Sequence, residues 1–205
     1  MTLDYKVISS GSAGNAVRID NILIDAGVPY KMLGKDIYKV DYLLLTHTHS
    51  DHLRKSTVNR IRKEFPHIKI IGNYEVAYTT RVDQISGHGK SMELGDWTVT
   101  AFPCVHDVIT QGFTLEQDDI RIIYATDTAT MDNAIPGPYD YLFLESNHDE
   151  VKIKKLQGDK STYGYSVWDG AMRHLSTQKS KAFYYMNRRD RDSKWIELHI
   201  SRRFY

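Results

Sequence analysis

Residues 41–52, with the sequence DYLLLTHTHSDH, decide how this chain can fold and which chemistry it can perform. Their first half, Tyr42 to Leu45, is a short apolar run that is typical of a β-strand buried on both faces. Their second half places three histidines and one aspartate within six positions, namely His47, His49, Asp51 and His52. A lone histidine is more often a surface or packed polar residue than a ligand, but four such side chains this close together favour a metal site.

The spacing inside this motif indicates what it can bind. In a loop that leaves a strand, side chains two positions apart can converge on one point, so we expect His47 and His49 to share one divalent ion. Asp51 and His52 then point to a neighbouring position. Imidazole nitrogens and carboxylate oxygens favour Zn²⁺ and leave Mn²⁺ or Fe²⁺ open, so the motif predicts a divalent metal centre without fixing the metal.

The length and composition indicate one globular domain. With 205 residues the chain is long enough for one sizeable core, and we expect a single domain over residues 1–205. The 41% of hydrophobic residues exclude a disordered chain. The net charge of +1, from 27 basic and 26 acidic residues, favours a small anionic substrate over long nucleic acid. The basic stretch from Lys179 to Arg203 leaves a polynucleotide open.

The single cysteine, Cys104, excludes a disulfide framework within the chain and favours a reducing compartment. The start MTLDYKVISS lacks the apolar core of a signal peptide, and no run approaches the roughly 20 apolar residues of a membrane span. We therefore expect a cytoplasmic protein that does not insert into membranes.

Short β-type and helical runs alternate along the chain, which predicts an α/β or α+β protein built on β-sheets. Strands are expected at residues 5–9, 16–19, 21–24, 42–45, 68–71, 97–102, 120–124, 141–144 and 181–185. Helices are expected at residues 53–64, 75–80, 149–156 and 166–175. The pattern contains no linker, repeat or low-complexity tract that divides the chain.

The motif at residues 47–52 matches in full the HxHxDH signature of the metallo-β-lactamase superfamily, which the chain resembles over most of its length. Ile22 to Gly27 (ILIDAG) is similar to the family's first motif, Pro103 to Asp107 (PCVHD) to its third, and Tyr124 to Thr128 (YATDT) to its fourth. The resemblance implies an αββα sandwich with two mixed β-sheets flanked by helices. It also implies a metal-dependent hydrolase with two divalent ions.

The resemblance implies six metal ligands, which are His47, His49, Asp51, His52, His106 and Asp127. His106 would complete the first metal site, and Asp127 would bridge to the second. Both follow predicted strands, where a sheet edge can present side chains to a cleft. Asp25 would lie behind the ligands and orient them. Asp51 is the expected catalytic residue, because it would orient the attacking hydroxide, accept its proton, or both.

Within the superfamily the chain resembles the YycJ/WalJ-like branch and the phage anti-Pycsar cyclic-nucleotide phosphodiesterases. The strings Ser9 to Asn15 (SSGSAGN) and Glu145 to Asp149 (ESNHD) carry this similarity, although as plain structure they are a glycine-rich turn and a helix N-cap region. The branch implies a phosphodiesterase for small or cyclic nucleotides, such as 3′,5′-cyclic mononucleotides, with a role in phage immune evasion. A YycJ-like nuclease for DNA or RNA is the alternative.

Substrate contacts are expected near these strings and near the late tyrosines, from Ser12, Asn15, Glu145, His148 and Tyr165. Turn amides and the Ser12 hydroxyl suit a phosphate, and a tyrosine suits stacking on a base. Tyr165 stands where related phosphodiesterases carry a histidine.

One ligand of the family pattern has no evident counterpart. The family usually carries another histidine after a late strand, but the strand expected at residues 181–185 is followed by MNR. Three residues are candidates for that role, namely His148, Asn187 and His174. Of these, we expect His174 to be an ordinary surface residue. A degraded member that binds a nucleotide without cleaving it is therefore a third hypothesis.

The resemblance also implies self-association, because related small phosphodiesterases look dimeric. Late tyrosines such as Tyr184 and Tyr185 offer aromatic area to an interface. We expect light scattering on the purified protein to give the mass of a homodimer. A monomer at every working concentration would contradict this prediction.

Overall fold

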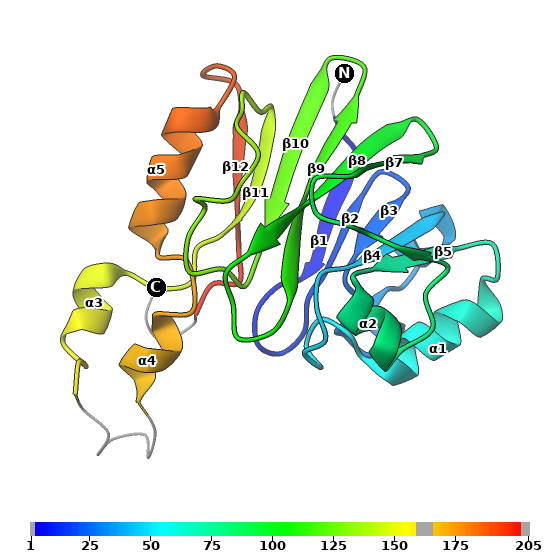
Figure 1. Ribbon diagram of the computed structural model, residues 1–205, viewed down its shortest axis with the longest axis horizontal. Coiled ribbons are helices and arrows are strands. Elements are labelled where there is room, and N and C mark those ends of the chain that lie inside the picture. The colour runs from blue at the N-terminus through cyan, green and yellow to red at the C-terminus, as the bar shows by residue number, and fades with distance from the viewer. Residues whose placement is uncertain (1–2, 159–165, 202–205) are drawn as a thin grey trace. The chain divides into compact units, whose positions relative to one another are not determined.

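The computed structural model describes residues 3–158 and 166–201 (Figure 1). The chain divides into two compact units, an N-terminal unit of residues 1–87 and a C-terminal unit of residues 88–205. Each unit is built on one six-stranded β-sheet. Each sheet combines antiparallel neighbours with parallel ones, and this mixture determines where the functional loops gather.

The sheet of the N-terminal unit follows the order of the sequence from β1 to β6. Its strands are β1 (Tyr5–Ser9), β2 (Ala16–Ile19), β3 (Ile22–Ile24), β4 (Tyr42–Leu45), β5 (Lys69–Gly72) and β6 (Gln84–Ile85). The first three strands are antiparallel, and β3 to β6 run parallel. Because the carboxyl ends of parallel strands meet at one edge of a sheet, the loops that follow β3, β4 and β5 gather there.

Two α-helices, α1 (Lys55–Glu64) and α2 (Tyr74–Thr79), and two 3-10 helices, η1 (Tyr30–Met32) and η2 (Asp36–Lys39), complete this unit. The apolar side of α1 buries Val58 and Ile61 in a cluster with Leu43 and Ile70 of the sheet. This packing fixes both ends of the loop of residues 46–54, which joins β4 to α1.

Backbone hydrogen bonds tie three loops of the N-terminal unit together at the strand ends. Asn15 N donates to Asp51 O over 2.7 Å, and Asn15 O accepts from Gly27 N over 2.9 Å. Ala26 N donates to His52 O over 2.9 Å. A Cβ atom on Gly27 would stand 1.6 Å from Asp51 O, so only glycine permits this approach of the two loops.

The sheet of the C-terminal unit has the order β12-β11-β10-β9-β8-β7. Its strands are β7 (Ser91–Leu94), β8 (Trp97–Cys104), β9 (Thr110–Gln117), β10 (Ile120–Ala125), β11 (Tyr141–Glu145) and β12 (Lys194–Leu198). Strands β7 to β10 form an antiparallel meander, and β10, β11 and β12 run parallel. The carboxyl ends of these three parallel strands therefore meet at one edge of the sheet.

Three helices, α3 (Glu150–Lys154), α4 (Val167–Ala171) and α5 (Thr177–Asn187), belong to the C-terminal unit. Helix α5 lies along the β11–β12 side of the sheet (Figure 1) and buries Phe183 in a cluster with Ile123, Leu142 and Leu144. The Ser176 side chain caps α5, because it accepts a hydrogen bond from the N–H of Lys179.

The fold class predicted from the sequence is confirmed, since the chain forms two mixed β-sheets flanked by helices. The strand expected at residues 181–185 is wrong, because these residues lie inside α5. Their aromatic residues favour a strand, but the Ser176 cap and the packing of Phe183 override that preference. The sequence pattern also did not reveal β7, β9 or β12.

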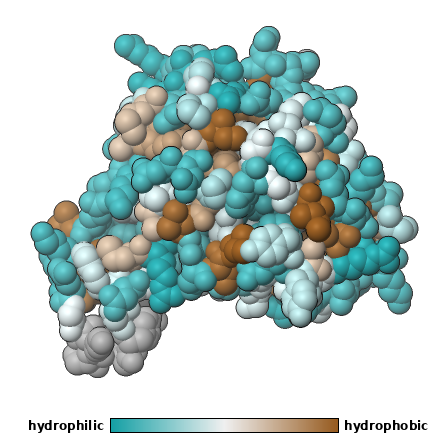
Figure 2. Space-filling view, in the orientation of Figure 1, coloured by the Kyte–Doolittle hydropathy of each residue, from teal (hydrophilic) through white to brown (hydrophobic). Residues whose placement is uncertain are grey.

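Within the described residues, no helix is long and apolar enough to cross a bilayer. Figure 2 shows that the visible face is mainly hydrophilic, with hydrophobic residues scattered singly or in small groups. Scattered apolar residues are ordinary on a protein surface and need no partner to explain them.

We expect Gly27→Ala to lower the free energy of unfolding by at least about 2 kcal/mol, because the added Cβ meets a backbone carbonyl that cannot move aside. Gly170→Ala is the matched control, since nothing lies within 4 Å of a Cβ at that position. Urea unfolding of both variants tests the prediction. Equal midpoints for the two variants would contradict it.

Candidate metal centre

Each unit carries a cluster of metal-ligand side chains at its strand ends. The N-terminal cluster consists of His47, His49, Asp51 and His52, and it occupies the loop between β4 and α1. The C-terminal cluster consists of His106, Asp127, Glu145, His174 and His199. Both clusters combine imidazoles with carboxylates, which is a donor set that Zn²⁺ accepts.

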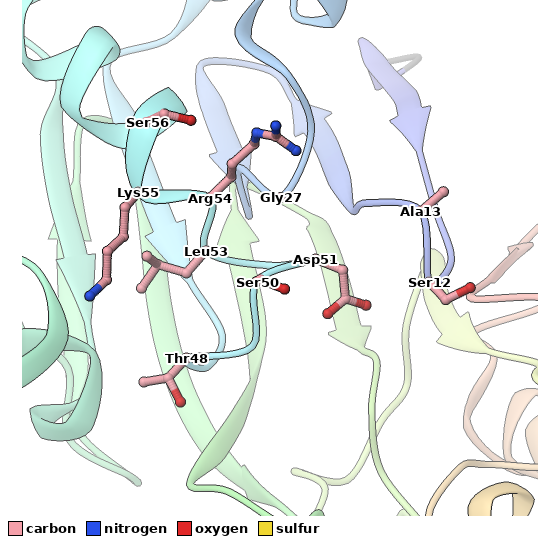
Figure 3. Close-up of a pocket in the computed structure, with 10 residues that line it drawn as sticks. All are labelled: Ser12, Ala13, Gly27, Thr48, Ser50, Asp51, Leu53, Arg54, Lys55 and Ser56. Carbon is pink, nitrogen blue, oxygen red and sulfur yellow. The ribbon is translucent and has the colours of Figure 1, made fainter. Parts of the chain in front are cut away.

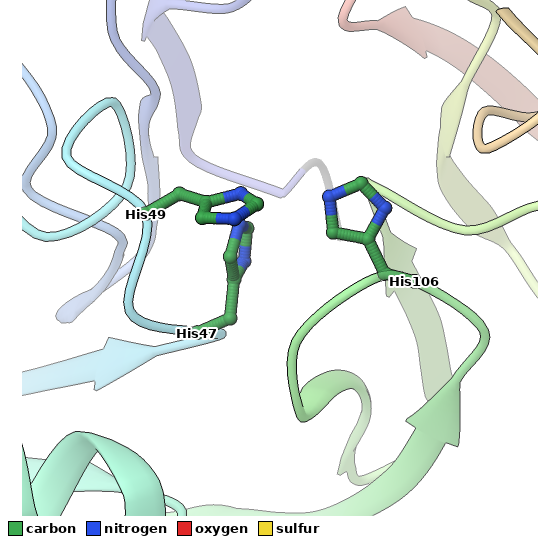
Figure 4. A group of neighbouring side chains, drawn as sticks. All are labelled: His47, His49 and His106. Atoms are coloured by element: carbon green, nitrogen blue, oxygen red, sulfur yellow. The ribbon is translucent and has the colours of Figure 1, made fainter. Parts of the chain in front are cut away.

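In the N-terminal cluster the histidine rings gather at the end of β4. The ring centroids of His47 and His49 lie 4.8 Å apart, and those of His47 and His52 lie 4.1 Å apart. Figure 4 shows His47 and His49 leaving the same loop with their rings next to each other. His47 and His52 are buried, whereas His49 and Asp51 are partly exposed. The loop thus presents its imidazoles as one group.

Asp25, directly after β3, orients this cluster through buried hydrogen bonds. Its Oδ2 atom lies 2.7 Å from His52 Nδ1, and its Oδ1 atom accepts from Thr46 N over 2.9 Å. The Thr46 hydroxyl donates to the same carboxylate over 3.0 Å and lies 2.9 Å from His47 Nδ1. Burial raises the pKa of Asp25, and His52 and Thr46 oppose that effect. Protein groups thus engage both histidines at Nδ1, as is usual for histidines that bind metal ions through Nε2.

Asn15 is fully buried and contacts both His52 and the backbone of the neighbouring loops. Its Nδ2 atom lies 2.8 Å from His52 Nε2, and its side chain also bonds the backbone of Gly11 and Asp51. The expectation that Asn15 touches substrate stays a prediction. Ser12 is exposed and lines a pocket of about 560 Å³ that extends to Asp51 (Figure 3).

The C-terminal cluster assembles at the ends of three parallel strands. Asp127 closely follows β10, Glu145 is the last residue of β11, and His199 follows β12. Together with His174, these residues each place one ligand atom within 4.8 Å of the others. Asp127 Oδ1 lies 3.6 Å from His174 Nδ1 and 3.7 Å from His199 Nε2.

Three strand ends use a backbone conformation that residues other than glycine rarely adopt. Asp25, Asp127 and His199 have φ angles of 62°, 55° and 52°. The other two cases, Asp20 and Asp118, lie in hairpin turns, where this conformation is common. A left-handed residue with a Cβ costs roughly 1 to 2 kcal/mol and persists where the surroundings demand it. At the three strand ends this left-handed conformation turns the chain sharply, and all three residues belong to the candidate site or support it.

Glu145 contacts two histidines of the C-terminal cluster and two backbone N–H groups. Its Oε1 atom lies 2.7 Å from His174 Nδ1 and 3.1 Å from His199 Nδ1, and its Oε2 atom accepts from the N–H groups of Thr128 and Leu175. Burial alone would raise the pKa of Glu145, but His174 and His199 lower it. Burial alone would lower the pKa of His174, but Glu145 raises it. Glu145 is fully buried and holds the two histidines in position, while the expected substrate contact stays a prediction.

His106 leaves the loop that follows β8 (Figure 4). Its Nε2 atom lies 3.8 Å from Asp127 Oδ1 and 3.2 Å from Asp107 Oδ1, and Asp107 pairs with Arg173 over 2.7 Å. Burial lowers the pKa of His106, which favours the neutral imidazole that metal ions bind. Burial raises the pKa of the Cys104 thiol to about 12, which suits a packed side chain rather than a nucleophile.

Two histidines of the C-terminal cluster differ from the expectation drawn from the sequence. His199 is a histidine after a late strand, which the sequence analysis did not find because it sought that strand at residues 181–185. His174 is not an ordinary surface residue, since its side chain is 20% exposed and bonds Glu145. The string IELHI at residues 196–200 is the signal that points to His199, because apolar residues alternate with polar ones as in a strand and a histidine follows.

The remaining candidates have other places in the fold. His148 is buried in an isolated β-bridge with Ser176 and joins no ligand group among the described residues, and the substrate contact expected there stays a prediction. The Asn187 side chain bonds the backbone of Gly137 and Phe183 at the end of α5. Tyr165 lies outside the described residues.

Comparison with protein families matches residues 20–186 to the family described as a beta-lactamase superfamily domain. The matched span contains Asp25, all of the N-terminal cluster and every member of the C-terminal cluster except His199. It covers more than half of the chain.

Two curated proteins are similar in sequence. Exodeoxyribonuclease WalJ of Streptococcus pneumoniae is 26% identical over 171 residues, which cover 71% of this chain and 62% of WalJ. Exodeoxyribonuclease YycJ of Bacillus anthracis is 28% identical over 180 residues, which cover 75% of this chain and 66% of YycJ. The chain therefore spans slightly less than two thirds of the length of these relatives.

Among solved structures, the metallo-β-lactamase fold protein YhfI of Bacillus subtilis matches with a TM-score of 0.72. The match covers 98% of this chain and 87% of YhfI at 16% sequence identity. At this identity the likeness shows the fold alone, and that fold is the one expected from the sequence.

The paired charges of Glu145 and His174 predict a pH-dependent contribution to stability in protein treated with a chelator. The pKa of His174 is raised, so its contribution is complete below its ordinary value of 6.5 and is lost as the pH rises through the raised pKa. The pKa of Glu145 is lowered, so its contribution is complete above its ordinary value of 4.5 and is lost as the pH falls through the lowered pKa.

We therefore expect His174→Gln to destabilise the chelated protein most between pH 4.5 and 6.5, and progressively less at alkaline pH. Urea unfolding across the pH range measures this, with His67→Gln, at an exposed position, as the control. A destabilisation by His174→Gln that does not change with pH would exclude the charged pair.

Proposed function

Because this chain belongs to the β-lactamase superfamily, we propose that it is a metal-dependent phosphodiesterase that hydrolyses nucleotide phosphodiester bonds. The observation that carries the proposal is the intact HxHxDH loop, in which the buried Asp25 carboxylate orients gathered imidazoles. An arrangement of this kind is costly to bury unless it serves binding or catalysis.

The assignment of residues to the proposed ions follows the family pattern. The first ion is assigned to His47, His49 and His106, and the second to Asp51, His52, Asp127 and His199. The chemistry of the residues fits such ions, since Asp25 and Glu145 engage the Nδ1 atoms of His52 and His199, as carboxylates behind metal-bound histidines do. The donor set favours Zn²⁺, with Mn²⁺ as the second candidate.

The proposed mechanism gives each of three carboxylates a distinct task. Bound ions supply the activation of water and the neutralisation of charge on the phosphoryl oxygens. Asp51 is the proposed catalytic residue, because its partly exposed carboxylate can orient the attacking water or take its proton. Asp25 fixes the orientation of His52, and Glu145 does the same for His199 while it holds a proton on His174.

Nucleotide phosphodiesters are the proposed substrate class, because the similar curated proteins are named exodeoxyribonucleases. Those names favour a DNA strand as substrate. The net charge of +1 and the resemblance to anti-Pycsar enzymes favour 3′,5′-cyclic mononucleotides instead. Both substrates present the same phosphodiester group to the centre.

The observation behind the third hypothesis, a degraded family member that binds a nucleotide without cleaving it, no longer holds. That hypothesis rested on a missing histidine after a late strand, and His199 follows β12. We also propose that the enzyme acts in the cytoplasm as a homodimer, on the basis of its single cysteine and its late tyrosines.

We expect Asp51→Ala to lower kcat/KM by at least about 100-fold with Mn²⁺ or Zn²⁺, for cyclic nucleotides, oligonucleotides or both. His199→Ala is expected to lower both activity and the number of ions bound per chain, which elemental analysis measures. His67→Ala, at an exposed position, is the matched control and keeps both. Turnover that is metal-independent, or equal in Asp51→Ala, would reject the proposal.

A further inference from the structure

The pocket beside the HxHxDH loop has a lining that suits an anion. It lies within the N-terminal unit, and its volume of about 560 Å³ exceeds what a single phosphate needs and falls in the range of small-ligand sites. Its walls are the turn after β1, the loop before α1 and the first residues of α1. The polar side chains that line it are Ser12, Thr48, Ser50, Asp51, Arg54, Lys55 and Ser56.

Arg54 and Lys55, the two basic residues of this lining, differ in their ion pairing from Arg60 and Arg62 of α1. Arg60 pairs with Glu64 over 2.8 Å, and Arg62 pairs with Asp83 over 3.4 Å. Arg54 and Lys55 are exposed and form no ion pair or side-chain hydrogen bond with any residue in the described ranges 3–158 and 166–201. Figure 3 shows their side chains leaving adjacent positions at the start of α1 in different directions. These two charges are therefore available to a ligand.

Hydroxyl and backbone donors reinforce the charges. Ser12, Ser50 and Ser56 bring hydroxyl groups to the pocket, and α1 begins there without a side-chain N-cap. The amide groups of an uncapped first turn carry partial positive charge and suit phosphate oxygens. The one carboxylate in the lining is Asp51, which the proposed function assigns to a metal ion.

The pocket is also firmly built. The turn after β1 is joined to the loop before α1 by the hydrogen bond from Asn15 N to Asp51 O. Gly27 also packs closely against Asp51 O of that loop. Asn15 further fixes the turn, because its Oδ1 atom accepts from Gly11 N over 2.7 Å. A site with fixed walls loses little entropy when it binds a charged group.

We propose that this pocket binds a phosphate of the substrate other than the one that is hydrolysed. The inference rests on the proposed function and deepens it, because Asp51 belongs both to the pocket and to the catalytic loop. A cyclic mononucleotide has only one phosphate and leaves the pocket unused. The preferred substrate is therefore an oligonucleotide strand, with Arg54 as the residue that binds its neighbouring phosphate.

The first test measures binding without catalysis. A short fluorescent oligo(dT) strand is titrated in the presence of EDTA into the wild type, Arg54→Ala and Lys63→Ala. Lys63 is the matched control, because it is an exposed basic residue at the far end of the same helix. We expect Arg54→Ala to weaken binding about tenfold more than Lys63→Ala does, with Arg54→Lys in between, and to reduce the salt slope by about one.

The second test separates this inference from the proposed function. With metal present, Arg54→Ala is expected to raise KM for the oligonucleotide about tenfold relative to Lys63→Ala, and to raise KM for bis(p-nitrophenyl) phosphate, which has a single phosphate, by much less. Equal binding and equal KM in Arg54→Ala and Lys63→Ala would overturn the pocket assignment even if hydrolysis is found. If the wild type hydrolyses neither substrate, the proposed function fails, and the binding comparison alone still decides the role of Arg54.

Discussion

The hydrogen bond between the buried Asp25 carboxylate and His52 is the interaction on which the arrangement of the N-terminal cluster depends. A buried carboxylate is costly unless its oxygens are satisfied, and Thr46 supplies both an N–H and a hydroxyl to it. The same contacts hold the chain after β3 against the loop after β4. Ligand orientation and loop position are thus fixed by one group.

In the C-terminal unit, Glu145 has the same role that Asp25 has in the N-terminal unit. It too is a fully buried carboxylate at the end of a parallel strand, and it too accepts backbone N–H groups while it engages histidines. Parallel strands explain why the pattern recurs, since they bring their carboxyl ends to one edge of each sheet. Left-handed residues at Asp25, Asp127 and His199 then turn the chain at those ends.

The sequence predicted local features well and distant partners poorly. The HxHxDH motif and the strand before it were identified because their ligands and apolar residues are contiguous. Residues 181–185 were assigned to the wrong element, because whether an aromatic run forms a helix or a strand depends on its cap and on what it packs against. That error concealed β12 and, with it, His199.

By itself, the sequence determined the kind of donors at the candidate site, the fold class and the loop that presents four of the candidate ligands, because these follow from residue type and spacing. Only the tertiary structure decided that Glu145 joins His174 to His199, that Asn15 is buried, and that Arg54 faces a pocket with no carboxylate partner among the described residues. The physical reason is that burial and charge pairing depend on residues far apart in the chain, whose meeting is set by strand order and not by local pattern.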